Sequence, residues 1–450
     1  MKHRAPLATL IAAAAMLAPG AAHADDGSMR WDRHGRLDFE ARFIVVASDA
    51  DMVASAYVDG DLGPREGRDA LSVIALDGDP RAWRAASVEV SNSVAGPPAV
   101  VDVTADGRFA IVVESWTPRP DGPGPHRFSD LAQGDRMFVV DLADPATPEV
   151  VQTIETFERP DAVRIAPSGD LVAVTYHPSG AGAETPLALY PFADGRLGAP
   201  ATPVIEDWDL NAGRLIDVDW HPTEPVLALL DERGATLRFA EVGADRSLTP
   251  FGNVVAIERA PYRVEFTPDG RHAVANALYW GEDIAGRWIE APRGSVLTVR
   301  MNAETSEEGA RHALVSRVTT GVSPEGLAVS PDGRWVATTN LERSYLPYDD
   351  PRITWHSSIT LAALDPETGV LTHKGEFPYD GILPEAAVFD NSSAYLAVVT
   401  YDHFDDRRDG GSVDFWRIDA DPLEPQTVRL VKTEHSVPVA RGAHSAAIAR

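Results

Sequence analysis

The 450-residue sequence contains no cysteine. This absence excludes disulfide bonds, thiolate metal sites, covalent c-type haem attachment and a cysteine nucleophile. We therefore expect neither haem nor a disulfide, and stability must come from apolar burial or from closure of the fold. The hydrophobic content of 44% is enough for a large core.

Basic charge is also scarce. The chain has 40 Lys and Arg against 68 Asp and Glu, for a formal net charge of −28. Binding to nucleic acid needs a basic surface, so we expect no nucleic-acid partner. The sequence also lacks a phosphate-binding glycine loop, a GxSxG elbow and an HExxH motif. We therefore expect no nucleotide cofactor.

Long apolar runs are absent except near the start of the chain. Residues 7–17 are mostly apolar, residues 2–4 before them are basic, and residues 22–24 read Ala-His-Ala. This order is typical of a cleaved export signal. We predict a signal peptide at 1–24 and a single mature domain at 25–450, located in the periplasm or secreted. Because no other run approaches ~18 apolar residues, we expect no membrane span.

The chain does contain a repeat of short apolar segments. In the clearest copy, strand-length runs rich in Val, Leu and Thr flank the turn at 330–333, and two more such runs follow at 358–364 and 371–377. Turn residues bound each run, which predicts a four-stranded antiparallel meander. The first hairpin recurs around residues 105–107, 167–169, 221–223, 268–270 and 390–392. The third strand recurs at 71–76, 137–142, 187–190, 236–239, 296–299 and 413–416.

With the copy at 358–364, the chain has seven third strands, which predicts an all-β, seven-bladed β-propeller with four-stranded antiparallel blades. The first unit lacks its own first strand and begins at 42–47, whereas the chain ends in an unmatched strand at 442–449. We expect the C-terminal strand to complete the N-terminal blade, because closure removes exposed sheet edges. The alternative, a linear array of separate sheets, leaves both ends open.

The segment SPEGLAVSPDGR at 323–334, followed by LDPETGVL at 364–371, resembles the YVTN and lactonase-like propeller superfamily. That group includes bacterial 6-phosphogluconolactonases and muconate-lactonising propellers. The resemblance extends in its period over almost the whole predicted mature chain, and it implies a seven-bladed fold. Lactonase-like blades often carry a histidine two residues after the proline that opens the first strand. Here those places hold Val100, Ala162, Arg263, Gly326 and Ala386.

Propeller geometry places the short Asp-Gly turns on one face and the longer loops on the other, around the mouth of the central channel. Loops of this length in a compact fold are usually functional or disordered. We therefore expect the functional site, with a small-molecule substrate or a protein ligand, on the long-loop face. The long loops are 48–70, 115–136, 177–186, 277–294, 340–357 and 400–411.

The residues that follow the opening prolines should form a ring near the channel mouth, because first strands line the channel. Carboxylates, a histidine and a phenol that converge there are costly without partners. The ring residues are Ala99, Asp161, Tyr262, Glu325 and Glu385, with His444 at the same register in the closing strand. The partners that the sequence offers are Arg164, Arg263, Asn276 and Asn340.

Three interpretations of this ring stay open. In one, a metal site formed by Asp161, Glu325, Glu385 and Asn340 holds Ca²⁺ or another divalent cation. That cation then acts as a Lewis acid on an ester or lactone carbonyl, while His444 or a carboxylate moves protons. In another, Arg263 and Arg164 bind a substrate anion, and Glu325 or Glu385 is the base. In the third, the charges pair with one another and only join neighbouring blades.

The leading hypothesis is an exported lactonase-like hydrolase or isomerase that acts on a small lactone, ester or carboxylated molecule. Its candidate catalytic residues are Glu325, Glu385, His444 and Arg263. The alternative is a non-catalytic binding or scaffold propeller that holds a protein or a cell-surface ligand on its long-loop face.

Overall fold

A short polar motif closes the hairpin between the first two strands of several blades. Thr104, Thr267 and Ser330 each donate a hydroxyl hydrogen bond to the aspartate two residues later, at 2.6, 2.7 and 2.6 Å. The glycine after each aspartate has φ between 66° and 69°, a left-handed conformation that glycine adopts without steric cost. The recurring Asp-Gly pairs therefore mark true strand reversals.

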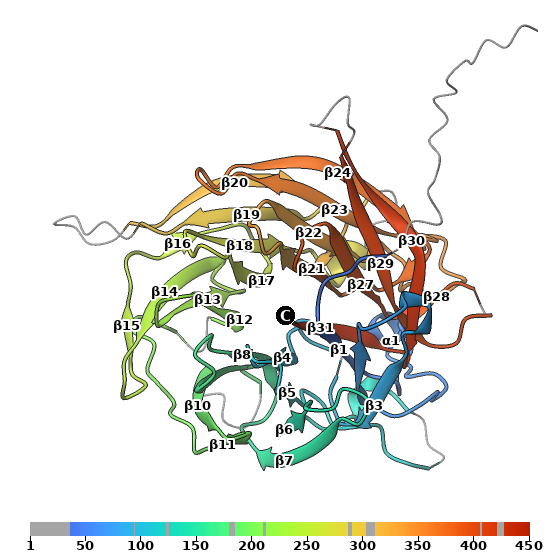
Figure 1. The fold of residues 1–450 in the computed structure, drawn as a ribbon, viewed down its shortest axis with the longest axis horizontal. Helices are drawn as coiled ribbons and strands as arrows, with labels where there is room; N and C mark the ends of the chain where they lie inside the picture. Colours follow the sequence, from blue (N-terminus) through green and yellow to red (C-terminus); the bar gives the residue numbers. More distant parts are fainter. Residues whose placement is uncertain are drawn as a thin grey trace, which may run out of the picture. The chain divides into compact units, whose positions relative to one another are not determined.

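The computed structural model describes residues 37–93, 95–122, 126–179, 185–209, 213–286, 290–302, 311–405, 407–420 and 427–450. These residues belong to one unit, 36–450. Within them, seven four-stranded antiparallel sheets succeed one another as blades in a ring around a central channel (Figure 1). The predicted all-β, seven-bladed propeller is confirmed.

The strand order within each blade runs from the channel outward. Blade 1 contains β31 (Ala443–Ala449), β1 (Phe43–Ser48), β2 (Ala70–Ala75) and β3 (Ala85–Glu89). Blade 2 contains β4 (Val101–Val103), β5 (Phe109–Val113), β6 (Arg136–Asp141) and β7 (Glu149–Glu155). Blade 3 contains β8 (Pro160–Ile165), β9 (Leu171–Tyr176), β10 (Leu187–Ala193) and β11 (Arg196–Leu197).

The next blades follow the same order. Blade 4 contains β12 (Leu215–Trp220), β13 (Val226–Asp231), β14 (Thr236–Val242) and β15 (Leu248–Pro250), with β16 (Val255–Ala256) also paired to β14. Blade 5 contains β17 (Pro261–Phe266), β18 (His272–Ala277), β19 (Ser295–Arg300) and β20 (Ala313–Thr319). Blade 6 contains β21 (Pro324–Val329), β22 (Trp335–Asn340), β23 (Ser357–Leu364) and β24 (Leu371–Tyr379). Blade 7 contains β26 (Ala386–Phe389), β27 (Tyr395–Thr400), β29 (Gly411–Ala420) and β30 (Val428–Val439).

The last strand of the chain closes the ring. β31 pairs antiparallel with β1, with Phe43 opposite Ala449 and Ser48 opposite Ala443. The predicted completion of the N-terminal blade by the C-terminal strand is therefore confirmed, and the alternative of a linear array is wrong. Aromatic side chains pack across the same seam between the last blade and the first. The ring of Phe415 lies 5.1 Å from that of Phe39 and 5.3 Å from that of Trp83.

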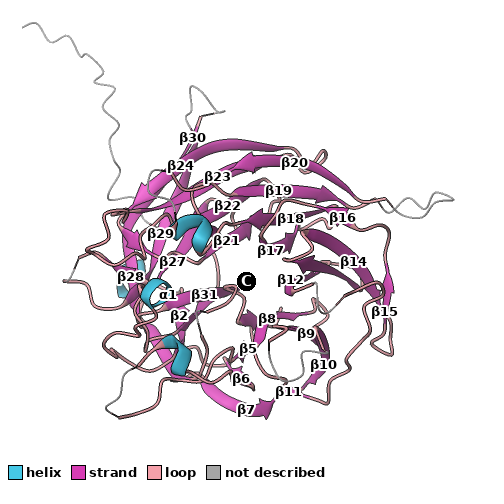
Figure 2. Ribbon diagram, turned by 180° about the vertical axis from the view of Figure 1, so that it is seen from behind, coloured by secondary structure: helices cyan, strands magenta, loops and turns pink. Residues whose placement is uncertain are grey.

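Loops, a short ribbon and two short helices gather beside the blades. α1 (Ala56–Asp59) lies between β1 and β2, α2 (Glu282–Ala285) lies between β18 and β19, and β25 (Gly381–Ile382) pairs with β28 (Asp402–His403). Figure 2 shows the face that carries α1, which is the predicted long-loop face. In the part of the chain that the structure describes, no helix is long and apolar enough to cross a membrane. The predicted signal peptide at 1–24 lies outside the described residues.

Candidate functional site

The predicted ring positions coincide with irregularities in the inner strands. The pairing of first and second strands shifts register between Pro160 and Ala162 and between Pro324 and Gly326, and the closing strand shifts between Ala443 and Ser445. Each shift leaves one residue unpaired, as in a β-bulge, which re-aims the side chain of that residue. The three unpaired residues are Asp161, Glu325 and His444, all of them predicted from the sequence.

An unusual backbone conformation precedes four of the opening prolines. Arg159, Ala260, Ser323 and Leu383 have φ of 58°, 59°, 52° and 47°, a left-handed conformation that side chains with a Cβ rarely adopt. Strained residues of this kind gather at functional sites because the surrounding structure must hold them in place. Here they turn the chain into the inner strand at the end where the strand begins, which is the channel mouth.

Glu325 and Glu385 lie beside each other at the mouth, on neighbouring blades. Glu325 is 5% exposed and Glu385 is 1% exposed. The close approach of the two blades depends on Gly326. A Cβ at that position would lie 2.7 Å from the carbonyl oxygen of Glu385 and 3.1 Å from the Cα of Ala386. We call Glu325 and Glu385 the mouth pair.

The two carboxyl groups of the mouth pair have unequal surroundings. Burial raises the pKa of Glu325 to about 8, although a hydrogen bond from Tyr262 and the charge of Arg263 act in the opposite direction. Burial also raises the pKa of Glu385 well above its ordinary value, and the charges of Glu325 and Asp49 raise it further. Both oxygens of Glu385 lack a hydrogen-bond partner among the described residues. The surroundings of Glu325, with a phenol donor and a nearby guanidinium, therefore favour its charged form more than those of Glu385 do.

Tyrosine side chains surround the mouth pair. The hydroxyl of Tyr401 donates to the carbonyl oxygen of Met52 at 2.6 Å, which ties the loop after β27 to the loop after β1. Electrostatic interaction with the mouth pair or with Glu325 alone helps to raise the pKa values of Tyr57, Tyr262 and Tyr345, after the larger effect of burial. The surroundings of the mouth pair are therefore phenolic and apolar, with few competing charges.

The linker between blades 1 and 2 contacts this site. The hydroxyl of Tyr262 donates to the carbonyl oxygen of Gly96 at 2.8 Å, and the guanidinium of Arg263 donates to that of Pro98 at 2.6 Å. Gly96 also lies against Asp161, because a Cβ on this glycine would be 3.6 Å from Asp161 Oδ1. Residues 95–98 therefore contact the inner strands of blades 3 and 5 at the mouth.

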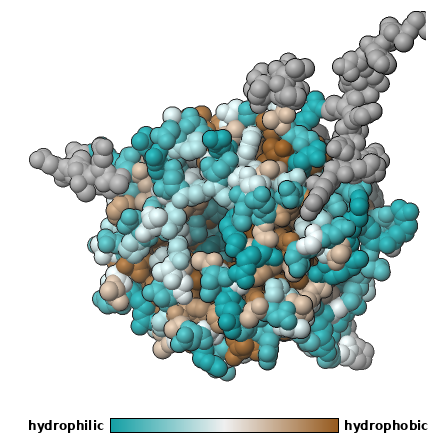
Figure 3. Space-filling model, in the orientation of Figure 1, coloured by the Kyte–Doolittle hydropathy of each residue, from teal (hydrophilic) through white to brown (hydrophobic). Residues whose placement is uncertain are grey.

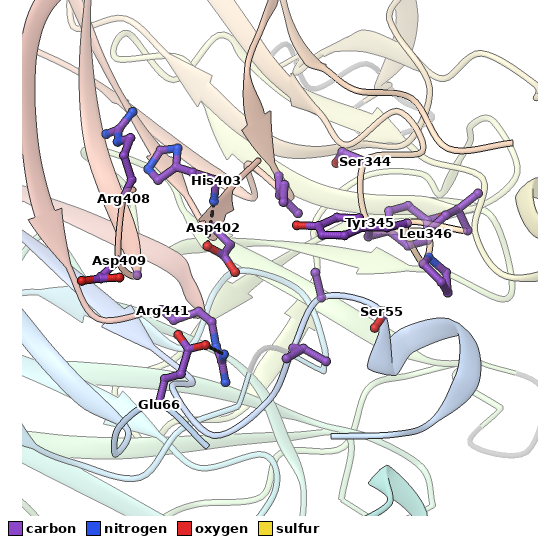
Figure 4. Close-up of a pocket in the computed structure, with 16 residues that line it drawn as sticks. Ser55, Glu66, Ser344, Tyr345, Leu346, Asp402, His403, Arg408, Asp409 and Arg441 are labelled. Atoms are coloured by element: carbon purple, nitrogen blue, oxygen red, sulfur yellow. Dashed lines mark hydrogen bonds and ion pairs between the residues drawn. The ribbon is translucent and has the colours of Figure 1, made fainter. Parts of the chain in front are cut away.

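A cavity of about 470 Å³ opens on the long-loop face, lined mainly by the loops after β1, β22 and β27. Figure 4 shows the hydroxyl end of Tyr345 directed into it, opposite Asp402 and Arg441. His403, Arg408 and Asp409 line its far side. Tyr345 both lines the cavity and interacts electrostatically with Glu325.

Deeper in the channel, the charged residues of the inner strands pair with one another. Arg263 Nε donates to Asp217 at 2.8 Å, and Arg164 lies 3.5 Å from the same carboxylate. Asp217 also accepts the backbone N–H of Val264 in the next blade at 3.0 Å. The contacts of these residues match the third interpretation of the ring charges, in which the charges pair with one another and join neighbouring blades. We call this group the channel network, and it comprises Asp102, Arg164, Asp217, Asp219, Arg263 and Glu265.

The channel also opens on the opposite face, where β31 and the other inner strands end. The centre of that face is hollowed and hydrophilic in Figure 3. The backbone N–H groups of Ile165 and Val329 donate there to Asp102 and Glu265 of the preceding blades, at 2.7 and 3.0 Å. Asp102 and Glu265, toward this end of the channel, thus accept hydrogen bonds from backbone N–H groups.

Two predicted site residues are engaged elsewhere. Asp161 accepts two hydrogen bonds from Arg214, at 2.9 and 3.2 Å, and forms a buried ion pair with it. The amide of Asn340 donates to Ser358 and Thr360 of its own blade, at 2.9 and 3.0 Å. The side chains of Asp161 and Asn340 are therefore used in structural contacts.

His444 and Asn276 also have partners of their own. The Nε2 atom of His444 lies 2.6 Å from Asn92 Oδ1, and burial lowers the pKa of this histidine to about 3, so the imidazole is neutral. The amide of Asn276 donates to the carbonyl oxygens of Pro324 and Glu325, at 2.7 and 3.1 Å. Asn276 therefore holds the backbone of the bulge that presents Glu325.

The predicted metal set finds no support in these contacts. In the described ranges, no group of three carboxylates or imidazoles with ligand atoms within 4.8 Å of one another contains Asp161, Glu325 or Glu385. Asn340 has its amide committed to hydroxyl groups. The metal role of these four residues stays a prediction, and we derive no chemical step from it.

Comparison with known proteins identifies the architecture. No family model matches the sequence, and no curated protein matches it at a significant level. A candidate 6-phosphogluconolactonase of Bacteroides uniformis superposes with a TM-score of 0.57 at 15% identity, over 90% of this chain and 99% of that one. The periplasmic gluconolactonase of Pseudomonas aeruginosa superposes with a TM-score of 0.56 at 16% identity, over 90% and 98%. The chain shares the β-propeller fold of these proteins. At this identity the likeness of the propeller to these proteins concerns the fold alone.

Sequence reasoning missed several residues of this propeller's site. Arg214 immediately precedes β12, an inner strand without an opening proline, so no register placed it opposite Asp161. Tyr57 belongs to the loop 48–70, which the sequence did single out, but its place beside the mouth pair depends on how the loop folds back. The linker at 95–98 carried no signal beyond its two prolines.

Proposed function

We propose that this propeller is a lactonase-like hydrolase or isomerase that acts at the channel mouth on a small lactone, ester or carboxylated molecule. The observation that carries the proposal is the mouth pair, two buried neighbouring carboxyl groups with unequal surroundings. Pairs of titratable groups whose pKa values are pushed apart supply the acid and the base of one reaction. The shared fold with gluconolactonases supports the same class of chemistry.

In hydrolysis of a lactone, ionised Glu325 takes a proton from water, and the water oxygen attacks the carbonyl carbon. Protonated Glu385 gives its proton to the leaving ring oxygen as the acyl C–O bond breaks. The products are a hydroxyl and a carboxyl group. Transfer of a proton from Glu325 to Glu385 restores the starting state. In an isomerisation, the same two groups take a proton from one atom of the substrate and return one to another.

Tyr262 suits Glu325 to the role of base. Its hydroxyl proton can serve only one acceptor at a time, either the carbonyl oxygen of Gly96 or the carboxylate of Glu325. When Glu325 is ionised, Tyr262 can donate to it, and after proton uptake Tyr262 can return to Gly96. Glu385 lacks such a donor among the described residues, which favours its protonated form and the role of acid.

We propose that the substrate enters through the cavity beside Tyr345. A volume of about 470 Å³ falls within the usual range of small-molecule sites, which is ~300–1,000 Å³. Arg408 lines this cavity with a side chain that is 34% exposed, and it can bind a substrate carboxylate. The phenol of Tyr345 can donate a hydrogen bond to the reacting carbonyl.

A hydrolysis assay with variants of the mouth pair tests the proposal. We expect wild-type protein to hydrolyse at least one member of a panel of aliphatic lactones and aryl esters. Because general acid–base groups contribute ~10²–10⁴-fold, Glu385→Gln should lower kcat by about 100-fold or more. The wild-type rate should rise with pH toward about 8, as Glu325 ionises.

Glu265→Gln is the matched control, because Glu265 is also a glutamate of an inner strand but is partly buried and belongs to the channel network. With circular dichroism to confirm folding, it should keep kcat within about 3-fold of wild type. No turnover with any member of the panel would overturn the proposal. So would equal losses in Glu385→Gln and Glu265→Gln.

A second candidate function is favoured by exposed aromatic side chains on the long-loop face. Tyr348 and Trp355 are 58% and 57% exposed, and both rings contact Phe404. Exposed rings of this kind are frequent at binding surfaces. A non-catalytic propeller would use this patch to hold a protein or cell-surface ligand, and Trp355→Ser would then abolish binding without any associated turnover.

We also propose that the chain is exported, with cleavage after Ala24, on the strength of the N-terminal pattern in the sequence. The intact mass of protein recovered from the periplasm or medium tests this proposal. A mass that still includes residues 1–24 would contradict it.

A further inference from the structure

Three aspartates come together in blade 1, away from the mouth pair. Asp49 and Asp51 follow the end of β1, and Asp69 immediately precedes β2. Their exposed fractions are 4%, 5% and 5%. One carboxylate oxygen of each lies within 4.8 Å of those of the other two. The two ends of the loop between β1 and β2 are therefore held together around three buried carboxyl groups.

Protein donors satisfy only part of this group. Asp51 Oδ2 accepts the backbone N–H of Arg119 at 2.6 Å, and Asp69 Oδ2 accepts that of Asn92 at 3.4 Å. Asp69 Oδ1 is buried and has no hydrogen-bond partner in the part of the chain that the structure describes. An ionised oxygen in this position costs several kcal/mol unless a cation or a donor reaches it.

Positive side chains nearby have other partners. Arg65 lies 3.9 Å from Asp51 Oδ2, but it donates to Asp121 at 2.5 Å and to the carbonyl oxygen of Arg119. Arg441 donates to the carbonyl oxygens of Ala50 and Pro64 and pairs with Glu66 at 2.6 Å. The hydrogen bonds of Arg65 and Arg441 are thus made mainly to groups outside the three aspartates.

We propose that Asp49, Asp51 and Asp69 bind one calcium ion per chain. Ca²⁺ takes oxygen ligands at ~2.3–2.6 Å, so two ligands of one ion lie at most about 5 Å apart. The spacing of the three carboxylate oxygens meets that limit. All-oxygen donors of this kind suit a hard cation, and the loop-borne carboxylates suit the flexible coordination of Ca²⁺ better than the strict octahedron of Mg²⁺.

The ion would act at the closure of the ring. The backbone N–H of Asp49 donates to the carbonyl oxygen of Gly442 at 2.9 Å, and Arg441 donates to Ala50. Asp51 and Asp69 in turn contact the segments that carry Arg119 and Asn92. One calcium ion would therefore join the loop after β1, the start of β2, the blade 2 loop and the approach to β31.

The test is calcium titration of the full chain after treatment with a chelator, by calorimetry and by thermal unfolding. We expect one ion per wild-type chain. At a calcium concentration of ~100 Kd, the midpoint should rise by about 3 °C or more. Asp69→Asn removes one charge with little change in shape, and it should weaken calcium binding at least about 10-fold.

Asp61→Asn is the matched control, because Asp61 is an exposed aspartate of the same loop. It should bind calcium as wild type does. If Asp69→Asn does not fold, Asp51→Asn serves in its place with the same expectation. A wild-type chain that binds no calcium, or an Asp69→Asn variant with unchanged affinity, would overturn the proposal. Equal affinity for magnesium would overturn the assignment to calcium.

Discussion

The inner strands of the propeller carry two groups of ionisable side chains, the channel network and the mouth pair, which differ in how far their carboxyl groups are paired. In the channel network, Asp217 lies against Arg263 and Arg164 and also accepts a backbone N–H from the next blade. In the mouth pair, Glu385 has neither a cation partner nor a hydrogen bond within the described residues. Asp217 and Glu385 are equally buried carboxyl groups, and pairing is the difference between them.

The comparison indicates that the paired carboxylates contribute to stability, whereas the unpaired ones are suited to proton transfer. A paired and hydrogen-bonded carboxylate holds two blades together and is poorly suited to exchange protons. An unpaired carboxyl group destabilises the fold in its charged form, but it can take up or release a proton near neutral pH. Buried charge alone therefore does not identify a site in this propeller; buried charge without a partner does.

Breaking the channel network should have the largest effect on stability. Arg263→Met leaves Asp217 in the interior with the longer contact to Arg164 as its remaining ion pair in the described residues, so we expect a loss of about 3 kcal/mol in the free energy of unfolding. Urea denaturation measures it. Arg407→Met is the control, because its ion pair with Asp405 is exposed and should contribute less than ~1 kcal/mol. If Arg263→Met kept wild-type stability but lost turnover, the result would contradict this structural role and would support Arg263 as a catalytic residue.

Separating the mouth pair should have a smaller effect on stability. In Gly326→Ala, the new Cβ would lie 2.3 Å from Thr339 Oγ1 and 2.7 Å from the carbonyl oxygen of Glu385, so blade 7 must shift. Overpacking of this kind costs ~1–3 kcal/mol. Turnover by the folded protein should fall as well, because the two carboxyl groups move apart. In Gly198→Ala, the Cβ would meet Pro191 Cγ at 3.0 Å on an outer strand, and turnover should not change.

The pH dependence of stability gives the smallest and most specific effect. The folded-state pKa of Glu325, about 8, lies above its ordinary value of 4.5, so the folded protein binds this proton more tightly than the unfolded chain. Stability should therefore fall as pH rises from about 5 to about 8. Glu325→Gln cannot lose this proton, and its melting temperature relative to wild type should rise by a few degrees over that interval. A difference independent of pH would show that Glu325 is not buried in its acid form.

The fold could be predicted in detail because its signals are local and repeated. Asp-Gly turns and opening prolines fix the ends of the strands, and a period of two residues then sets which side chains point inward. The same register placed Glu325, Glu385 and His444 correctly at the ends of inner strands. Ring closure followed from one missing and one extra strand.

Partners could not be predicted, because they come from distant segments. Asp161 pairs with Arg214 of the next blade, and His444 meets Asn92 of a linker, over separations that no local pattern records. Asp49, Asp51 and Asp69 come together because the first long loop folds its ends toward each other, which no local pattern in the sequence records. We expected Asn340 to be a partner of the ring residues, but its amide donates hydrogen bonds to hydroxyl groups of its own blade.

Closure of blade 1 also determines when the protein can finish folding. Phe43 and Ala449 pair across about 400 residues of chain, so the first strand to leave the ribosome waits for the last one. Contacts of such long range form late and slowly. Until β31 arrives, β1 presents an unpaired edge, and blades 1 and 7 lack their seam. The ring therefore stays open until β31 has left the ribosome, and until then a chaperone can still hold the unpaired edge of β1.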